Sequence, residues 1–203
     1  MKRLLFLIGI IPAVLVGCKT INPNDTKPTV VVSIQPQKYF VDRIVDTLLR
    51  VEVMVPSGSS PETYEPTASQ LKSLSSATAY FSLGLLEFEM SMLKNIQEQN
   101  PSLLVVNHSL ELNLLEGQCD SHHNQGHEHR HVHGFDPHVW SSPAEVGKMV
   151  RTIADVLSKQ FPCYSSTFKL NAQSFLSDID SLDRHSRSEL VGTVSKKFFW
   201  IFI

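Results

Sequence analysis

The chain has 203 residues, with 18 Lys or Arg, 20 Asp or Glu and nine His, and a net charge of −2. The basic residues form no stripe along the sequence, so a nucleic-acid partner is not expected. The length is sufficient for a packed domain of ordinary size.

The first 28 residues have the pattern of an export signal followed by a tether. Two basic residues precede the apolar run Leu4–Val16, which is too short for a stable membrane span and typical of a secretory signal. The run leads into Leu15-Val16-Gly17-Cys18, which matches a bacterial lipobox. We therefore expect a signal peptide over 1–17, a lipid on Cys18 and a flexible tether over 18–28. A cleaved signal with a chance cysteine is the alternative. Cleavage removes two of the 18 basic residues, which leaves 16 against 20 acidic ones, a net charge of −4.

Strand and helix patterns alternate from residue 29 onward, and this alternation implies βαβ units with a parallel sheet. The capping-box sequence Thr67-Ala68-Ser69-Gln70 opens one short helix. The fold class predicted from the pattern is therefore α/β, with a four-stranded parallel N-terminal domain. Strands are expected over 29–34, 51–55, 79–83 and 103–106, and the other helices of this part over 38–49 and 86–97.

The second half of the chain is predicted to be helical. Ser142-Pro143-Ala144-Glu145 is a second capping-box sequence, which opens a helix that runs to about Gln160, before Phe161-Pro162. A longer helix follows over 166–191, with His185 as a solvent or packing residue. The apolar residues of this helix share one stripe: Phe168, Ala172, Phe175, Ile179 and Leu182.

The apolar segment 195–203 reads as a buried strand within which the sequence stops. A natural terminus seldom falls inside such a strand, because its backbone needs sheet neighbours. The simplest interpretation is a truncated second domain, and a last strand that completes the existing sheet is the alternative. The predicted plan is an N-terminal domain over 29–160, a linking helix over 161–194 and the start of a second α/β domain over 195–203.

A histidine-rich loop is predicted over 119–134. Residues 127–131 match the zinc-protease pattern H-E-x-x-H, with His127, Glu128 and His131 in the required positions. That site needs a helix, but glycines bracket the segment and it has no apolar face for packing. We expect instead a flexible loop that collects zinc, since histidine-rich tracts are typical of metal binding. A polar loop without a role is the alternative. The histidines of the loop are His122, His123, His127, His129, His131 and His133.

Two cysteines, Cys119 and Cys163, remain besides the lipobox cysteine. An export compartment permits a disulfide between them, but the sequence alone leaves the pairing open. Cys119 as a soft metal ligand beside the histidines is a further alternative.

Binding residues of an open parallel sheet lie in loops that follow the carboxyl ends of its strands. Two such loops stand out, Pro56–Thr67 after the second strand and Ser109–Ser141 after the fourth. Both open on the same edge of the predicted sheet. This placement allows Glu62 and His138 to face one another across a cleft.

Three motifs resemble a known family. They are Val55-Pro56-Ser57-Gly58 through Tyr64-Glu65-Pro66-Thr67, then Gly84-Leu85-Leu86-Glu87, then Asp136-Pro137-His138-Val139-Trp140. Their order and spacing are similar to those of the metal-binding solute-binding proteins of ABC transporters, in particular the zinc-uptake type called ZnuA. The match extends from about residue 29 to 203, and the histidine-rich insert lies where zinc-type members carry theirs.

The resemblance implies two α/β domains joined by a long backbone helix, with a metal ion held between them. His138 matches a metal-binding histidine of the family. Glu62 lies where the family usually has its first histidine, so Ser60-Pro61-Glu62 is a departure from Asp-Pro-His. A carboxylate can also ligate zinc, and a surface role for Glu62 is the alternative. The remaining ligands of the family are expected beyond Ile203.

The function implied is a lipid-anchored extracytoplasmic protein that captures Zn²⁺ and delivers it to an ABC importer. Its partners are then the membrane permease, the ATPase and the membrane itself, and it is not an enzyme. Zinc is favoured over manganese because the candidate ligands are rich in imidazole. The alternatives are a zinc-dependent hydrolase that uses His127, Glu128 and His131, and a periplasmic metal buffer or adhesin.

Overall fold

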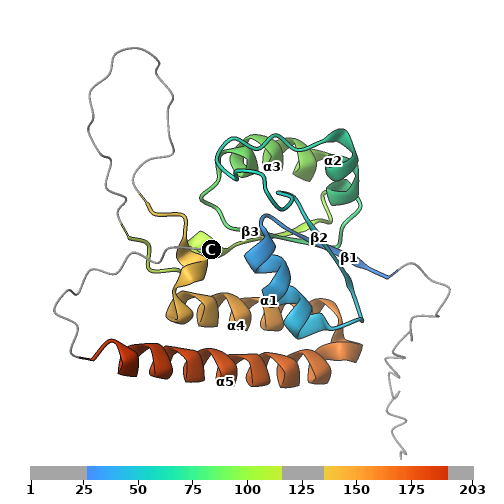
Figure 1. The fold of residues 1–203 in the computed structure, drawn as a ribbon. Helices are drawn as coiled ribbons and strands as arrows, with labels where there is room; N and C mark the ends of the chain where they lie inside the picture. The colour runs from blue at the N-terminus through green and yellow to red at the C-terminus, as the bar shows by residue number, and fades with distance from the viewer. Residues whose placement is uncertain (1–26, 116–134, 192–203) are drawn as a thin grey trace, which may run out of the picture.

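The computed structural model describes residues 27–115 and 135–191 (Figure 1). The signal peptide and lipid site, the histidine-rich loop and the segment 195–203 therefore lie outside the described residues. The division into a domain over 29–160 and a linking helix over 161–194 stays a prediction.

The four predicted strands form one parallel sheet in the order β2-β1-β3-β4. This arrangement confirms the predicted α/β class. Each strand is four residues long. The first three strands end one or two residues before the predicted boundary. The strands are β1 (Thr29–Val32), β2 (Arg50–Val53), β3 (Ala79–Ser82) and β4 (Leu104–Asn107).

Helices cover both faces of the sheet (Figure 1). α2 and α3 lie on one face and α1 and α4 on the other, and α5 packs along α4 and α1 as an outer layer. Three single 3₁₀ turns are present in the described residues: η1 (His108–Leu110) after β4, η2 (Val139–Ser141) before α4, and η3 (Pro162–Tyr164) between α4 and α5. The helices are α1 (Gln35–Val45), α2 (Ala68–Ser75), α3 (Glu87–Gln99), α4 (Pro143–Gln160) and α5 (Ser165–Glu189).

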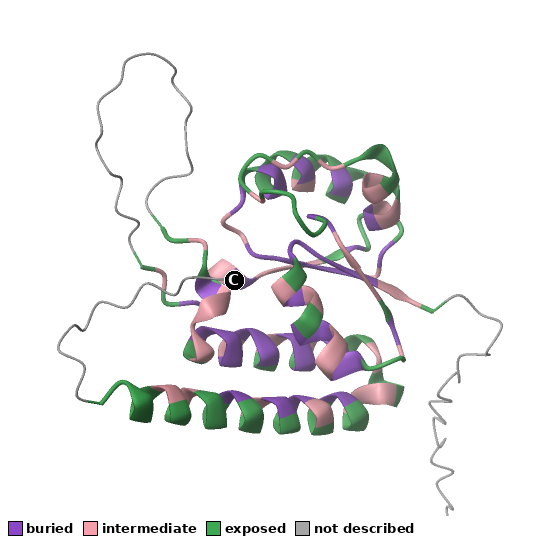
Figure 2. Cartoon of the chain, viewed as in Figure 1, coloured by how far each residue is buried: buried purple, intermediate pink, exposed green. Residues whose placement is uncertain are grey.

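The two central strands form the middle of the core. All four residues of β3 are buried, and so are the three valines of β1 from Val30 to Val32. Burial on both faces is the usual state of a parallel sheet, and it explains the unbroken apolar runs of these strands. The inner face of α4 is buried against the sheet, while most of α5 is exposed (Figure 2).

The first helix begins earlier than predicted. The sequence places it over 38–49 with Pro36 as the end of a strand, but α1 starts at Gln35 and contains Pro36 in its first turn. Proline fits there because the first amides of a helix have no intrahelical acceptor. Gln37 then bends back, and its Oε1 accepts hydrogen bonds from the amides of Ser33 and Ile34 at 3.1 and 3.3 Å.

One predicted capping box is confirmed and the other is wrong. Thr67 Oγ1 accepts the amide hydrogen bond of Gln70, and Gln70 Oε1 accepts that of Thr67, at 3.3 and 2.9 Å. The side chain of Ser142 makes no capping hydrogen bond at the start of α4. The carboxylate of Glu145 instead accepts a hydrogen bond from the amide of Asn113, from a distant part of the chain.

Helix α5 follows its predicted stripe except at Leu182. Phe168, Ala172, Phe175 and Ile179 are buried, whereas Leu182 is 58% exposed. The last turns of α5 line an open hollow through Asp183, Ser186, Arg187 and Leu190, and Leu182 is not part of this lining. His185 is exposed on the same helix.

Within residues 27–115 and 135–191, no helix combines the length and the apolar character needed to cross a lipid bilayer. Cys163 in η3 is disulfide-bonded. Cys119 lies outside the described residues, so whether Cys163 pairs with it stays open, as it was from the sequence.

Candidate metal-binding site

A hollow of about 870 Å³ opens at the carboxyl edge of the sheet. Its walls are the start of α4, the chain on either side of the histidine-rich segment, and the last turns of α5. Asp136 and His138 lie in this wall, and we call it the His138 hollow. The predicted position of His138 at this edge is thus observed.

Asp136 holds the imidazole of His138 in one orientation. One carboxylate oxygen, Oδ1, lies 2.7 Å from His138 Nδ1 and accepts the His138 amide hydrogen bond at 2.9 Å. With Nδ1 donating to the carboxylate, Nε2 carries the free lone pair. The His138 side chain is 52% exposed, so this nitrogen belongs to a ring that solvent reaches. A carboxylate on one nitrogen is the usual support of a metal-ligating histidine.

The electrostatics of this pair favour a charged Asp136. Burial alone would raise the pKa of Asp136, but the hydrogen bonds from the backbone and imidazole of His138 outweigh it, so the pKa is lowered. An ionised Asp136 stabilises the Nδ1–H form of His138, and that form leaves Nε2 ready to bind a metal ion.

Trp140 connects the His138 motif to the loop after β2. Its indole lies 5.1 Å from the His138 ring, centroid to centroid. It also lines a second hollow of about 240 Å³ together with Pro56–Ser59 and Pro61. The loops after β2 and β4 therefore open on the same edge, as the sequence predicts.

Glu62 is exposed and lines neither of the two hollows. Among the residues that the structure describes, no three side chains of His, Cys, Asp or Glu come together as a possible metal site. His138 and Glu62 are thus two candidate ligands of a site that is not complete within this part of the chain. Their joint role remains a prediction.

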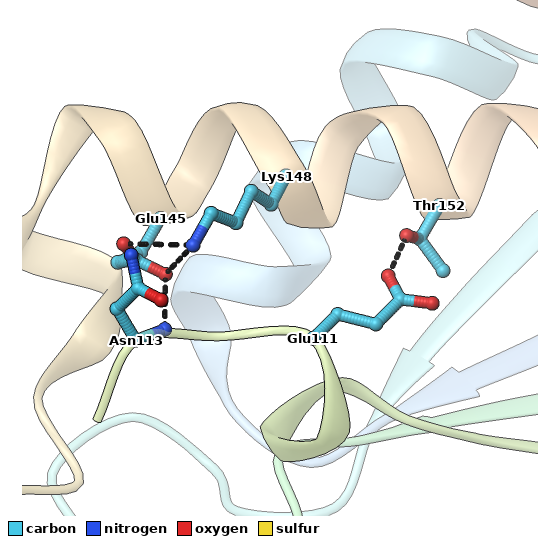
Figure 3. A network of polar contacts seen from close by, with 5 residues as sticks. All are labelled: Glu111, Asn113, Glu145, Lys148 and Thr152. Carbon is cyan, nitrogen blue, oxygen red and sulfur yellow. Dashed lines mark hydrogen bonds and ion pairs between the residues drawn. The ribbon is translucent and has the colours of Figure 1, made fainter.

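The two ends of the histidine-rich segment are fixed close to His138. The amide of Asp136 donates to the carbonyl of Leu115 at 2.9 Å, so the chain leaves and returns at one point. Two side-chain contacts tie the outgoing end to α4 (Figure 3). Glu145 accepts the Asn113 amide hydrogen bond at 2.9 Å, and Thr152 donates to the carboxylate of Glu111.

A buried carboxylate that the sequence did not single out shapes the neighbouring loop. Glu89 accepts hydrogen bonds from the amides of Leu83 and Gly84, both at 2.7 Å, and from Leu86 at 3.2 Å. Burial raises the pKa of Glu89, although these hydrogen bonds oppose the shift. The motif residue Glu87 is exposed, whereas Glu89 holds the turn after β3. In the sequence, the only feature that could have pointed to Glu89 is its position in α3, two residues after Glu87.

His108 is a second histidine at this edge that the sequence did not single out. It directly follows β4, is 1% exposed and stacks on Phe81 with ring centroids 5.8 Å apart. Neither ring nitrogen has a hydrogen-bond partner within the described residues. Burial lowers its pKa to about 4, against a smaller opposing effect of Glu111. The environment is that of a core residue.

A comparison with protein families assigns most of the chain to one family. Residues 30–201 match the model of the family described as zinc-uptake complex component A, periplasmic. The chain belongs to this family. The resemblance predicted from the three motifs is thereby confirmed.

Curated relatives carry related names. A protein of Streptococcus pneumoniae named zinc-binding lipoprotein AdcA is 29% identical over 98% of this chain and 40% of its own length. A protein of Bacillus subtilis named high-affinity zinc uptake system protein ZnuA is 28% identical over 83% of this chain and 53% of its own length. The chain thus spans about half or less of the length of these relatives.

Solved structures of family members have the same fold. A crystal structure of ZnuA has a TM-score of 0.70 at 31% identity and covers 85% of this chain and 62% of its own. Zinc-bound AdcA from Streptococcus pneumoniae also has a TM-score of 0.70, at 25% identity, over 85% of this chain and 34% of its own.

Proposed function

We propose that this chain captures Zn²⁺ outside the cytoplasm, as the lipid-anchored solute-binding component of an ABC importer. The observation that carries the proposal is the Asp136–His138 pair, which offers one imidazole nitrogen at the edge of a large hollow. Family membership and the names of the zinc-binding relatives support zinc as the cargo. The partners are a membrane permease and its ATPase, and Cys18 carries the lipid.

The ligand set begins with His138 Nε2 and a carboxylate oxygen of Glu62. A tetrahedral zinc site needs further ligands, and these come from outside the described residues. Imidazole favours zinc over manganese, which prefers sites rich in oxygen. The protein performs no chemistry on the ion; selection depends on ligand type and geometry.

The histidine-rich segment adds weaker zinc sites near the hollow. Its two ends meet at Leu115 and Asp136, two residues before His138, so zinc bound there is concentrated beside the stronger site. Ordering a long segment around an ion costs conformational entropy, which weakens its binding relative to a preformed site.

Calorimetric zinc titration of the full chain tests the proposal. We expect His138→Ala to abolish the tightest equivalent, while His185→Ala, a matched change at an exposed helical histidine, leaves it intact. Deletion of 120–133 should remove only the weaker equivalents. An unchanged isotherm for His138→Ala would contradict the site. Peptidase or esterase turnover abolished by Glu128→Gln would instead favour a hydrolase.

A further inference from the structure

Glu145 occupies the first turn of α4 and lines the His138 hollow. Glu145 is buried, with only 7% of its surface exposed. The carboxylate accepts a hydrogen bond from the amide of Asn113 at 2.9 Å and pairs with Lys148 Nζ at 3.0 Å (Figure 3). Glu145 therefore does not cap α4 together with Ser142. Its hydrogen bond goes instead to Asn113, in a distant part of the chain, and the role of this contact is the question.

A short series of hydrogen bonds leads from Glu145 to the imidazole of His138. Glu145 holds the amide of Asn113, and two residues later the carbonyl of Leu115 accepts the amide hydrogen bond of Asp136 at 2.9 Å. Asp136 in turn lies 2.7 Å from His138 Nδ1. Helix α4 is thus connected to the candidate ligand His138 through the backbone on either side of the histidine-rich segment.

We propose that Glu145 is a positioning residue for metal binding at His138, acting through Asn113, Leu115 and Asp136. This inference rests on the proposed function. Glu145 fixes the outgoing end of the segment, this end fixes Asp136, and Asp136 orients the imidazole. Groups behind a metal ligand commonly contribute on the order of tenfold to affinity, because they hold the ligand in its binding orientation.

The structure supplies a control within the same pair of elements. Thr152 lies two turns after Glu145 on α4 and donates to the carboxylate of Glu111, on the same outgoing segment. This contact attaches the segment to the helix but is one step further along the chain from Asp136. Its loss tests whether general loosening of the segment is enough to weaken metal binding.

The experiment compares zinc affinity, by calorimetry on the full chain, for Glu145→Met, Glu145→Gln and Thr152→Val. Methionine keeps the volume but provides no strong acceptor, whereas glutamine keeps an acceptor for the Asn113 amide. We expect Glu145→Met to weaken the tightest zinc equivalent about tenfold. Glu145→Gln should restore the affinity to within about twofold, and Thr152→Val should leave it unchanged. The amide resonance of Asp136 should move in Glu145→Met alone.

Three results would overturn the inference: unchanged affinity in Glu145→Met, equal weakening in Thr152→Val, or no rescue by glutamine. The amide resonance of Asp136 can be read at low temperature, so a less stable variant still gives an answer. His138→Ala, titrated in parallel, separates the two proposals. If it leaves the tightest equivalent intact, the proposed function fails and the inference fails with it. If His138→Ala abolishes that equivalent while Glu145→Met leaves it unchanged, only the inference fails.

Discussion

His108 and His138 both lie at the carboxyl edge of the sheet, but the protein surrounds their rings in opposite ways. His108 is buried against Phe81, and within the described residues neither ring nitrogen has a partner. His138 is half exposed, with Nδ1 held by Asp136. The first ring is packed as an apolar group, and the second is oriented as a ligand.

The difference shows which property makes a histidine a candidate ligand. A metal ion needs one nitrogen with a free lone pair that it can reach, and a partner on the other nitrogen to fix the ring. His138 meets both conditions, whereas burial denies His108 both. The number of nearby histidines, which first draws attention to 119–134, does not measure either condition.

The largest expected effect of this contrast is acid sensitivity at His108. Its pKa is about 4 in the folded protein and about 6.5 when unfolded, so the unfolded chain takes up the proton first as the pH falls. The contribution of the uncharged His108 to the free energy of unfolding is therefore complete above about pH 6.5. It is lost as the pH falls to about 4, which lowers the stability by about 3 kcal/mol. Urea unfolding between pH 7 and pH 4 measures it.

The variant His108→Leu isolates this contribution from that of other titrating groups. Leucine fills an apolar site without a titrating nitrogen, so the variant should lose less stability than the wild type over the same pH range. Parallel pH dependences of the two proteins would show that the buried ring is not responsible.

Asp136→Asn is expected to weaken zinc binding about tenfold, because the amide holds the His138 ring without a charge. Asp183→Asn is the matched control, since Asp183 also lines the His138 hollow but pairs with Arg187. Calorimetry on both variants measures the effect. Equal weakening in both would indicate a general loss of negative charge in place of an oriented ring.

His138→Ala should have the smallest effect on folding. The side chain is half exposed, so the free energy of unfolding should change by no more than about 0.5 kcal/mol. Chemical denaturation without metal provides the measurement. A loss of about 2 kcal/mol would mean that His138 supports the fold, and its effect on zinc would then need another interpretation.

Much of the fold follows from local sequence, because apolar periodicity and turn residues act over short distances. The four strands and the Thr67–Gln70 cap are of this kind. The cap predicted at Ser142 fails because Glu145 bonds to Asn113, 32 residues away in sequence. Leu182 has the periodicity of a buried residue but is 58% exposed. Such outcomes depend on tertiary neighbours that a local pattern does not contain.

The candidate site divides in the same way. His138 is found through its motif, but the hydrogen bond that orients its ring becomes visible only in the structure. Glu89 and His108 belong to no recognised pattern, and their burial depends on how α3, β3 and β4 pack. Glu62 remains a prediction from the resemblance. Cys18, which is predicted from the lipobox pattern, and the six loop histidines, which are predicted from composition, also remain predictions.

The most direct test of the central claim is the long-range ¹H–¹⁵N spectrum of the imidazole nitrogens, with His138 assigned through His138→Ala. Before zinc is added, we predict a protonated Nδ1 and an unprotonated Nε2 for His138. One equivalent of zinc should shift the Nε2 resonance and leave Nδ1 protonated. A His138 spectrum that stays unchanged while the other histidines respond would contradict the assignment of His138 as the primary ligand.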